Sequence, residues 1–284
     1  MKKFIMNTAT LTAKYLPARA KKAIYRFPLV AGFLRQQLNW ASPEGITPLS
    51  IAGGELAGMQ MALDLQSEKD YWLGTYETTL QSAISHFVKP GMVVYDLGAN
   101  IGYISLLLAK YVGLNGFVYA FEALPENLTR LKLNIELNQL NAVIIVIEKA
   151  VVDTTREVNF LVGPSGGTGK VEGSTGRQNL EYSATISIPG VSLDAFVFDL
   201  NNPAPQVIKM DIEGGETLAL KGMKRLFSEV QPIILLELHG PESARTTWET
   251  LTNAGYTIHH LQSGYPRVSS INELDWKAYL VATC

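Results

Sequence analysis

Residues 93–103 read Val93-Val94-Tyr95-Asp96-Leu97-Gly98-Ala99-Asn100-Ile101-Gly102-Tyr103, and this stretch decides the fold. A short run rich in β-branched and aromatic residues ends at an acid, which is typical of a buried strand. Two glycines follow, and apolar residues then recur at helical spacing at Ile104, Leu107, Leu108 and Tyr111. The stretch therefore predicts a strand, a tight turn and a helix. Such a turn lets a ligand approach the backbone, and the helix N-terminus offers unpaired N–H groups.

The glycine spacing distinguishes two kinds of nucleotide-like ligand. A dinucleotide fingerprint would place glycines at 98, 100 and 103, where this chain has Gly98, Asn100 and Tyr103. The acid at 96 would also repel a pyrophosphate, whereas it suits the α-ammonium group of a methionine-like ligand. A second strand-like run, residues 116–122, ends at Glu122, whose carboxylate can accept both hydroxyls of a ribose. These features together predict S-adenosylmethionine (SAM), in contact with Asp96, Gly98, Ala99, Asn100, Gly102 and Glu122.

Composition bounds the class of protein. The chain has 284 residues, 47% of them hydrophobic, and a formal net charge of -2 at pH 7. This length allows one large α/β domain with an extension, and the near-neutral charge gives no general attraction to nucleic acid. Cys284 has no partner within the chain, so we expect no disulfide and a cytoplasmic location. No run approaches the roughly 18 apolar residues of a membrane-spanning helix, and polar residues interrupt the start of a secretory signal.

The first part of the chain differs in charge from the rest. Residues 1–43 contain eight Lys and Arg residues and no Asp or Glu. We interpret them as a solvated arm or as a peripheral contact with a membrane or polyanion, although Pro17 and Pro28 interrupt a long amphipathic helix. Residues 47–65 predict a small hairpin. We therefore expect a basic N-terminal arm and cap over residues 1–68 and the main domain over residues 69–284.

Beyond residue 90 the chain alternates strands and helices. Apolar runs predict further strands near residues 143–147, 206–211, 232–238, 256–261 and 278–282, the last antiparallel, and residues 216–227 predict one of the helices. Such alternation predicts a mostly parallel sheet with helices on both faces and a ligand at the carboxyl ends of its strands. That edge gathers the polar residues at the strand ends, which are Asp96, Glu122, Asp211, Glu213, Glu237 and His239.

Two further features are expected beside this edge. Residues 163–181 hold six glycines and no periodic apolar pattern, which is typical of a functional lid or a disordered segment. Asp153 follows another apolar run and could bind the amino group of an adenine. An ordinary turn residue is the alternative interpretation of Asp153.

Charged residues interrupt two of the apolar strands. Lys209 and Asp211 share a face of one strand, and Glu237 and His239 share a face of the next. Burying such groups is costly unless they are paired, so they indicate either a site or a buried ion pair. A structural pair of Lys209 with Glu237 or Glu213 is the alternative to a functional role.

Five motifs in unbroken order carry a resemblance to a known family. They are Asp96-Leu97-Gly98-Ala99-Asn100-Ile101-Gly102-Tyr103, Phe121-Glu122, Ser192-Leu193-Asp194, Lys209-Met210-Asp211-Ile212-Glu213-Gly214-Gly215-Glu216 and Glu237-Leu238-His239. Over residues 70–262 the chain resembles the FkbM family of SAM-dependent methyltransferases. It departs from the family pattern at Ala123-Leu124-Pro125, where a proline usually follows the acid directly.

The resemblance implies a class I (Rossmann-like) methyltransferase fold with seven strands. It also implies SAM as cofactor and methyl transfer, usually to a hydroxyl of a sugar, glycolipid or polyketide-type acceptor. Transfer to oxygen gains from alignment of the two reactants and from a base that accepts the hydroxyl proton. We predict Asp211 and His239 as the base candidates, with Glu213 third, and Asp153 and Asp211 as further cofactor contacts.

Several alternatives stay open at this point. A SAM-binding scaffold without catalysis would keep the cofactor residues, and a nicotinamide-dependent dehydrogenase is disfavoured by the glycine pattern. No metal is expected, although Asp211, Glu213, Glu237 and His239 could converge on a divalent ion. The sequence leaves the acceptor and the oligomeric state undetermined.

Overall fold

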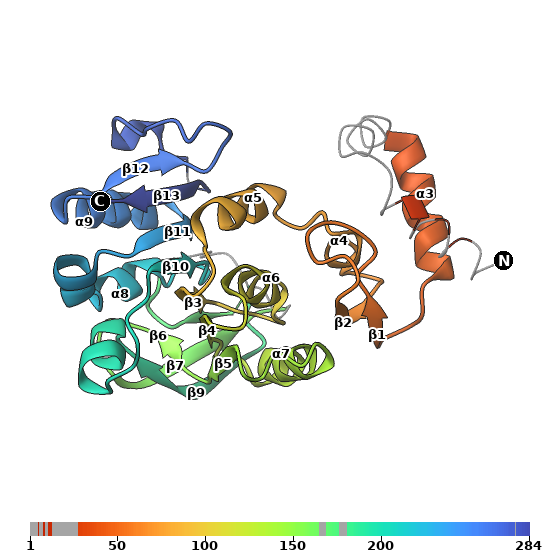
Figure 1. Ribbon diagram of the computed structural model, residues 1–284, viewed down its shortest axis with the longest axis horizontal. Helices are drawn as coiled ribbons and strands as arrows, with labels where there is room; N and C mark the ends of the chain where they lie inside the picture. The colour runs from red at the N-terminus through yellow and green to blue at the C-terminus, as the bar shows by residue number, and fades with distance from the viewer. Residues whose placement is uncertain are drawn as a thin grey trace. The chain divides into compact units, whose positions relative to one another are not determined.

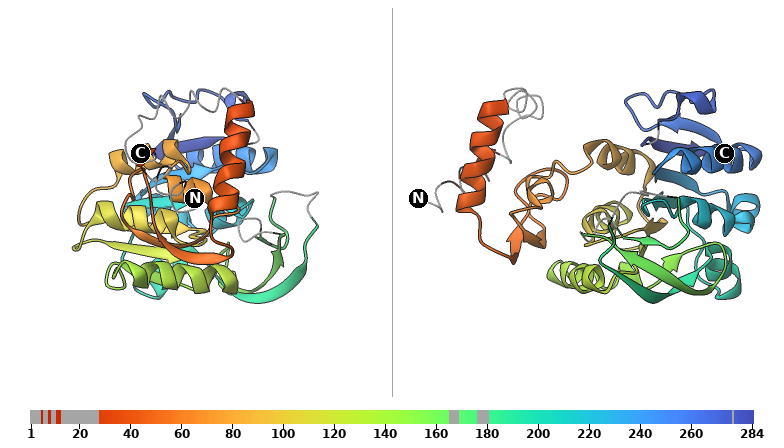
Figure 2. Two further views of the ribbon diagram at one scale, coloured as in Figure 1. Left: turned by 90° about the vertical axis from the view of Figure 1, so that its right-hand side faces the viewer. Right: turned by 180° about the vertical axis from the view of Figure 1, so that it is seen from behind.

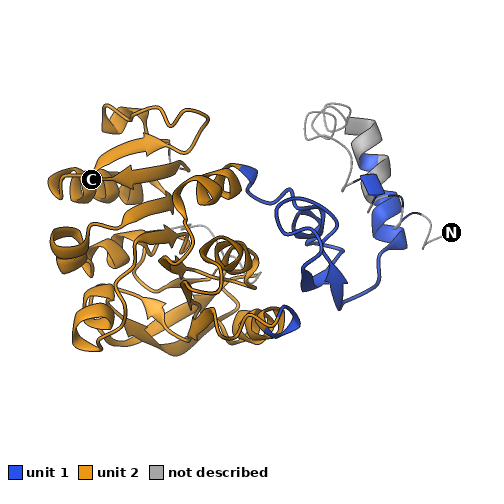
Figure 3. Cartoon of the chain, viewed as in Figure 1, with its two compact units in different colours: residues 1–78, 136–138 blue, residues 79–135, 139–284 orange. Residues whose placement is uncertain are grey.

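The computed structural model describes residues 5, 8, 11, 12, 28–164, 169–175, 181–275 and 277–284. The chain divides into two compact units, residues 1–78 with 136–138 and residues 79–135 with 139–284 (Figure 3).

The first unit contains one small hairpin. The elements of this unit are α3 (Pro28–Ala41), β1 (Ile46–Ser50), β2 (Gln60–Asp64) and α4 (Lys69–Leu73). β1 and β2 pair antiparallel with Ile46 opposite Asp64, which confirms the predicted hairpin. Most of the basic arm lies outside the described residues, so its membrane contact stays a prediction. Among the described helices, none combines the length and the hydropathy that crossing a membrane requires.

The second unit is built on a seven-stranded sheet (Figure 1). Its order is β12 (Thr257–His260), β13 (Tyr279–Thr283), β11 (Ile233–Glu237), β10 (Val207–Met210), β3 (Val93–Leu97), β4 (Phe117–Phe121) and β5 (Ile144–Ile147). The strands from β11 to β5 are parallel, whereas β13 is antiparallel to both neighbours. The predicted α/β fold is confirmed. The strand order reverses between β3 and β10, so their carboxyl ends form the switch point at which such sheets bind ligands.

Helices cover both faces of this sheet. α5 (Thr78–Phe87), α6 (Tyr103–Val112) and α7 (Pro125–Leu137) lie along one face, and α8 (Glu216–Lys221) and α9 (Pro241–Asn253) lie along the other (Figures 1 and 2). Residues 103–109 of α6 are all buried, as expected of a helix that is apolar around most of its circumference. α6 begins directly after the glycine turn, which places its N-terminus at the switch point.

Aromatic side chains pack beneath the strand ends that carry the acids. Tyr95 on β3 and Phe121 on β4 are fully buried, and their ring centroids lie 5.4 Å apart. Phe196, in a single helical turn η1 (Ala195–Asp199), contacts Phe121 edge-on at 5.0 Å. Each such side chain contributes roughly 1.5–3 kcal/mol by its burial. Because Tyr95 and Phe121 directly precede Asp96 and Glu122, this packing fixes where the two acids emerge.

A smaller four-stranded sheet follows β5 in the sequence. Its order is β6 (Ala150–Val151), β9 (Ala184–Val191), β7 (Arg156–Val162) and β8 (Lys170–Val171). β8 lies within the segment 163–181 that we expected to be irregular, and Val171 pairs with Phe160. That part of the expectation is wrong because Val171 buries its side chain in the small sheet's core. Residues 165–168 and 176–180 of the predicted lid lie outside the described residues.

The helix predicted over residues 216–227 is divided into two. α8 ends at Lys221, and a second helical turn, η2, covers Leu226–Val230. Between them, a Cβ atom on Gly222 would stand 2.5 Å from the carbonyl oxygen of Val152. Gly222 is the C-cap residue of α8, and only glycine allows so close an approach of two backbones.

Candidate functional site

The turn after β3 is tightly packed against the end of β10. Gly98 has φ 78°, and a Cβ atom there would lie 2.0 Å from the carbonyl oxygen of Asp211. The amide of Asp211 in turn donates to the carbonyl oxygen of Leu97 at 3.1 Å. Asn100 also has positive φ, 50°, which asparagine tolerates better than most residues. The turn is therefore a close contact between the carboxyl ends of β3 and β10, which are neighbours in the sheet.

Glu122 fixes this turn from the neighbouring strand. Its Oε2 atom accepts the amide of Asn100 at 2.8 Å, and its Oε1 atom accepts the amides of Ala123 at 3.0 Å and Leu124 at 2.8 Å. Burial raises the pKa of Glu122, and these hydrogen bonds oppose the rise. The side chain of Asn127 also hydrogen-bonds to this carboxylate, so all of its roughly four acceptor positions are used within the chain. The predicted contact of Glu122 with a ribose stays a prediction.

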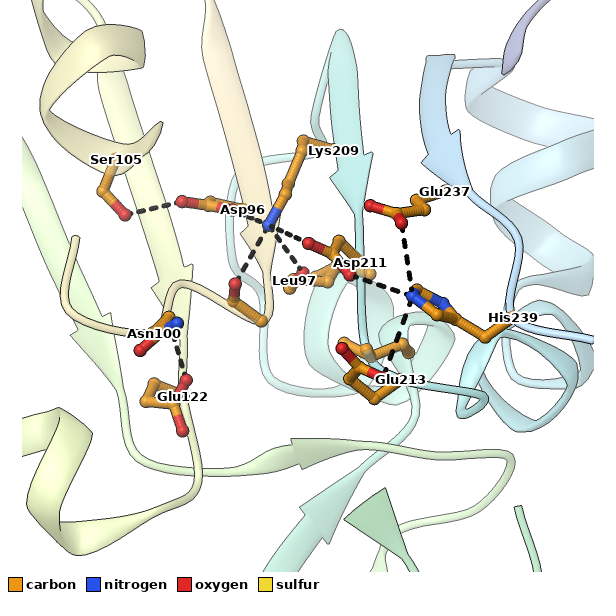
Figure 4. Close-up of polar contacts among 12 residues, drawn as sticks. Asp96, Leu97, Asn100, Ser105, Glu122, Lys209, Asp211, Glu213, Glu237 and His239 are labelled. Atoms are coloured by element: carbon orange, nitrogen blue, oxygen red, sulfur yellow. Dashed lines mark hydrogen bonds and ion pairs between the residues drawn. The ribbon is translucent and has the colours of Figure 1, made fainter. Parts of the chain in front are cut away.

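Asp96 is fully buried and forms an ion pair with Lys209 (Figure 4). The Nζ atom of Lys209 lies 3.1 Å from Oδ1 of Asp96, and Ser105 donates its hydroxyl to Oδ2 at 2.6 Å. Lys209 also donates to the carbonyl oxygen of Gly98 at 2.9 Å, inside the turn. Lys209 is thus in a structural ion pair, as the alternative proposed, but the pair is with Asp96, its neighbour on β3, and at a longer 4.0 Å with Asp211 Oδ2. The contact of Asp96 with a ligand ammonium stays a prediction.

His239 lies among carboxylates at the end of β11 (Figure 4). Its Nε2 atom is 3.7 Å from Asp211 Oδ1, 3.9 Å from Glu213 Oε2 and 3.5 Å from Glu237 Oε1. Its Nδ1 atom is 3.0 Å from Oε1 of the fully buried Glu216. The sequence motif contains Glu216, but sequence reasoning assigned it no role. Nothing in a helix-start acid indicates that it will face a histidine from another strand.

These carboxylates decide the protonation state of His239. Burial alone would lower the pKa of the imidazole, but the hydrogen bond and charge of Glu216, together with the charges of Asp211 and Glu213, raise the pKa to about 9. At neutral pH the ring is therefore an imidazolium that donates from both nitrogens. The predicted role of His239 as a base would require a pH above this value, because the ring already carries its second proton at neutral pH.

A second cation reaches the cluster from the chain before β13. Lys277 Nζ lies 2.7 Å from Glu237 Oε1. Burial would lower the pKa of Lys277, but the hydrogen bond with Glu237 and the charges of Asp211 and Glu213 raise it. Glu237 is thus held between Lys277 and His239. No sequence pattern near residue 277 signalled this contact, since it depends on β13 entering the sheet beside β11.

The same cluster contains a possible ligand set for a metal. Asp211, Glu237 and His239 each offer one ligand atom, and these atoms lie within 4.8 Å of one another. A metal would have to displace the proton of the imidazolium and the contact of Lys277 with Glu237. The sequence prediction of no metal stays a prediction.

Asp211 and Glu213 are the accessible acids of the cluster. Their side chains are 21% and 20% exposed, against 6% for Glu237 and 0% for Glu216. Glu213 also has φ 51°, an unusual backbone state for a non-glycine residue that tends to occur at functional sites. SAM carries a sulfonium and an ammonium group, so accessible carboxylates beside a glycine turn suit its positive charge.

Asp153 lies after β6, on the small sheet. Its Oδ1 atom accepts from Arg156 at 2.6 Å. Burial raises the pKa of Asp153, but the hydrogen bond and charge of Arg156 lower it overall. This ion pair fits the alternative interpretation of Asp153 as a turn residue, and its adenine contact stays a prediction.

Comparison with known proteins relates the site to a family. The model of the methyltransferase FkbM domain matches residues 96–258, which include all of the site residues described above except Lys277. The hexuronic acid methyltransferase AglP of Haloferax volcanii is 25% identical over 203 residues, covering 70% of this chain and 79% of that protein.

Two solved structures are similar to the chain at low sequence identity. The methyltransferase FkbM from Methylobacillus flagellatus KT is 20% identical, with a TM-score of 0.44 over 79% of this chain and 56% of that chain. Fibrillarin from Aeropyrum pernix, in complex with SAM, is 11% identical, with a TM-score of 0.43 over 73% of this chain and 74% of that chain.

Proposed function

Because this chain belongs to the FkbM methyltransferase family and is a SAM-dependent methyltransferase, we propose that it methylates a hydroxyl oxygen on a sugar-containing acceptor. The observation that carries the proposal is the accessible pair of Asp211 and Glu213 beside the glycine turn. A neutral hydroxyl is a poor nucleophile, and this pair offers it a carboxylate at the switch point. The relative named as a hexuronic acid methyltransferase supports a sugar as the acceptor.

The chain's own residues have distinct parts in this reaction. When bound, SAM supplies a methyl group on a sulfonium, which is already electrophilic. The turn held by Glu122 and Lys209 positions the backbone against the cofactor. Asp211 accepts the hydroxyl proton on a carboxylate oxygen, and Glu213 is the alternative acceptor. A base in this position contributes roughly 10²–10⁴-fold to the rate.

His239 acts through the acids and is a positioning residue. As an imidazolium it lies between Asp211, Glu213 and Glu237, and Glu216 holds its other nitrogen. Its positive charge keeps several carboxylates together that would otherwise repel one another. The acids can thus stay close to one another at the switch point.

The product of the reaction tests the proposal. The full-length protein is incubated with methyl-labelled SAM and para-nitrophenyl glucoside or glucuronide, and the labelled product is then treated with mild alkali. A methyl ether on a hydroxyl survives this treatment, whereas a methyl ester on a carboxylate is hydrolysed. We expect an alkali-stable label. A label released by alkali would overturn hydroxyl methylation, and SAM binding without any transfer would favour the scaffold alternative.

A further inference from the structure

The second unit contains a cavity of about 330 Å³. Its walls come from four parts of the second unit, which are Leu161 on β7, the β8 segment, Tyr182 before β9 and Glu242 in the first turn of α9. This volume is at the lower end of the range for small-molecule sites, about 300–1,000 Å³, and suits one compact acceptor unit.

Thr175 joins the cavity to the predicted acids. Its amide and its hydroxyl both donate to the carbonyl oxygen of Gly214, at 3.0 Å and 3.1 Å. A Cβ atom on Gly240 would lie 3.9 Å from the carbonyl oxygen of Thr175. Gly214 and Gly240 directly follow Glu213 and His239 in the sequence. The cavity therefore adjoins the acids proposed to accept the proton, on the side of β10 and β11.

The cavity contains a buried positive charge. Lys170 is 5% exposed, and it is the one cation among the described residues that line the cavity. Its Nζ atom lies 3.4 Å from the carbonyl oxygen of Ser174 and 5.8 Å from the centroid of the Tyr182 ring. Charges attract more strongly where they are shielded from water, so an anion beside the buried Lys170 would be attracted more strongly than one beside a surface lysine.

A buried hydroxyl in the same wall lacks a partner. Ser174 is 5% exposed, and its Oγ atom has no hydrogen-bond partner among the described residues. Buried polar groups are nearly always hydrogen-bonded, so an orphaned one at a cavity wall indicates a group that binds there. Lys170 and Ser174 together offer a cation and a hydroxyl on one wall.

We propose that this cavity binds the methyl acceptor by an anionic group, a carboxylate or a phosphate on its sugar, through Lys170 and Ser174. The inference rests on the proposed function, since it names the acceptor of that same reaction. An acceptor held in this way has its anion at Lys170 and leaves a neutral hydroxyl for Asp211 or Glu213. Lys170 is then a specificity-determining residue and takes no part in the proton transfer.

Binding of matched probes tests the proposal without any methyl transfer. The full-length protein, saturated with S-adenosylhomocysteine, is titrated calorimetrically with para-nitrophenyl glucuronide, its neutral counterpart para-nitrophenyl glucoside, and glucose-6-phosphate. We expect a charged probe to bind about tenfold or more tightly than the glucoside. Preference for the glucuronide identifies a carboxylate, and preference for the phosphate identifies a phosphate. Equal binding of all three probes, or binding of none, overturns the proposal.

Variants assign the effect to the cavity. Lys170→Met should remove the preference for charged probes, Lys170→Arg should retain most of it, and Ser174→Ala should weaken every probe. Lys224→Met removes an exposed lysine elsewhere on the same unit and should change nothing. Affinity for SAM should stay within about twofold in all four variants, and a large loss in Lys170→Met would assign the lysine to the cofactor and overturn the proposal.

Methyl transfer by the same proteins separates this inference from the proposed function. If the protein binds the glucuronide through Lys170 but methylates no hydroxyl, the result supports the anion site and contradicts the proposed O-methyltransferase activity. If the protein methylates the glucoside and the glucuronide with equal kcat/KM, the result supports the proposed activity and contradicts the anion site.

Discussion

Lys209 and Asp96 are direct neighbours across β10 and β3, and their charged atoms meet at 3.1 Å with both side chains buried. Burying a single charge without its partner is far more costly than burying the pair. Asp96→Asn should therefore reduce the free energy of unfolding by about 3–5 kcal/mol. Urea unfolding measures this, and the double variant Asp96→Asn/Lys209→Met should recover part of the loss. A stable Asp96→Asn protein that no longer binds SAM would instead show that Asp96 contacts the ligand directly.

Replacing Gly98 by alanine should damage both the fold and the cofactor site. The new Cβ would meet the Asp211 carbonyl oxygen, and φ 78° strains any side chain. Gly264→Ala is the matched control, since Gly264 has φ 83° with nothing within 4 Å. We expect Gly98→Ala to lower the melting temperature well beyond the control and to abolish SAM binding by calorimetry. Equal effects of the two substitutions would mean that backbone strain, and not the contact with Asp211, governs position 98.

Protonation of His239 should make stability depend on pH. The pKa of His239 is about 9 in the folded chain against the ordinary value of 6.5 expected in the unfolded chain. The contribution of its protonation to the free energy of unfolding is therefore complete below about pH 6.5 and is lost as pH rises through about 9. A shift of this size corresponds to about 3 kcal/mol. Urea unfolding of the wild type and His239→Gln at pH 6.5, 8 and 10 gives the difference. A difference that stays constant with pH would contradict an imidazolium at this site.

Loss of the proposed base should reduce turnover without weakening cofactor binding. We expect Asp211→Asn to lower kcat by about 10²-fold or more, because the base acts in the transition state. SAM affinity should stay within a few-fold. Glu229→Gln, which removes an exposed carboxylate paired with Arg225, is the control and should keep full activity. A near-normal kcat in Asp211→Asn would show that Asp211 is not the base. Either Glu213 would then accept the proton, or the alignment of the acceptor with SAM would account for the rate without a base.

Removal of divalent metal should leave the reaction unchanged. His239 as an imidazolium and Lys277 already supply positive charge to Asp211 and Glu237. We therefore expect dialysis against a chelator to preserve kcat, measured with and without added magnesium or manganese. A loss that either ion restores would show that a metal occupies this cluster.

Sequence patterns located the acids but did not identify their partners. Asp96, Glu122 and Asp211 each end or follow a parallel strand, so periodicity alone placed them on one edge. The partner of Lys209 depends on the order and register of the strands, which set it beside Asp96. Glu216 and Lys277 face His239 and Glu237 across elements distant in sequence, and no local pattern encodes such contacts. The division of the helix at Gly222 depends likewise on a backbone contact with Val152.

The place of β13 between β11 and β12 affects the order in which the sheet can form during synthesis. β12 pairs with β13 in the large sheet, and Leu236 of β11 is opposite Leu280 of β13. Until residues 279–283 have left the ribosome, β11 is an open edge and β12 has no strand to join. Such edges are prone to wrong pairing. Lys277 reaches Glu237 only when this last strand enters, so the charge arrangement at the site is completed at the same step as the sheet.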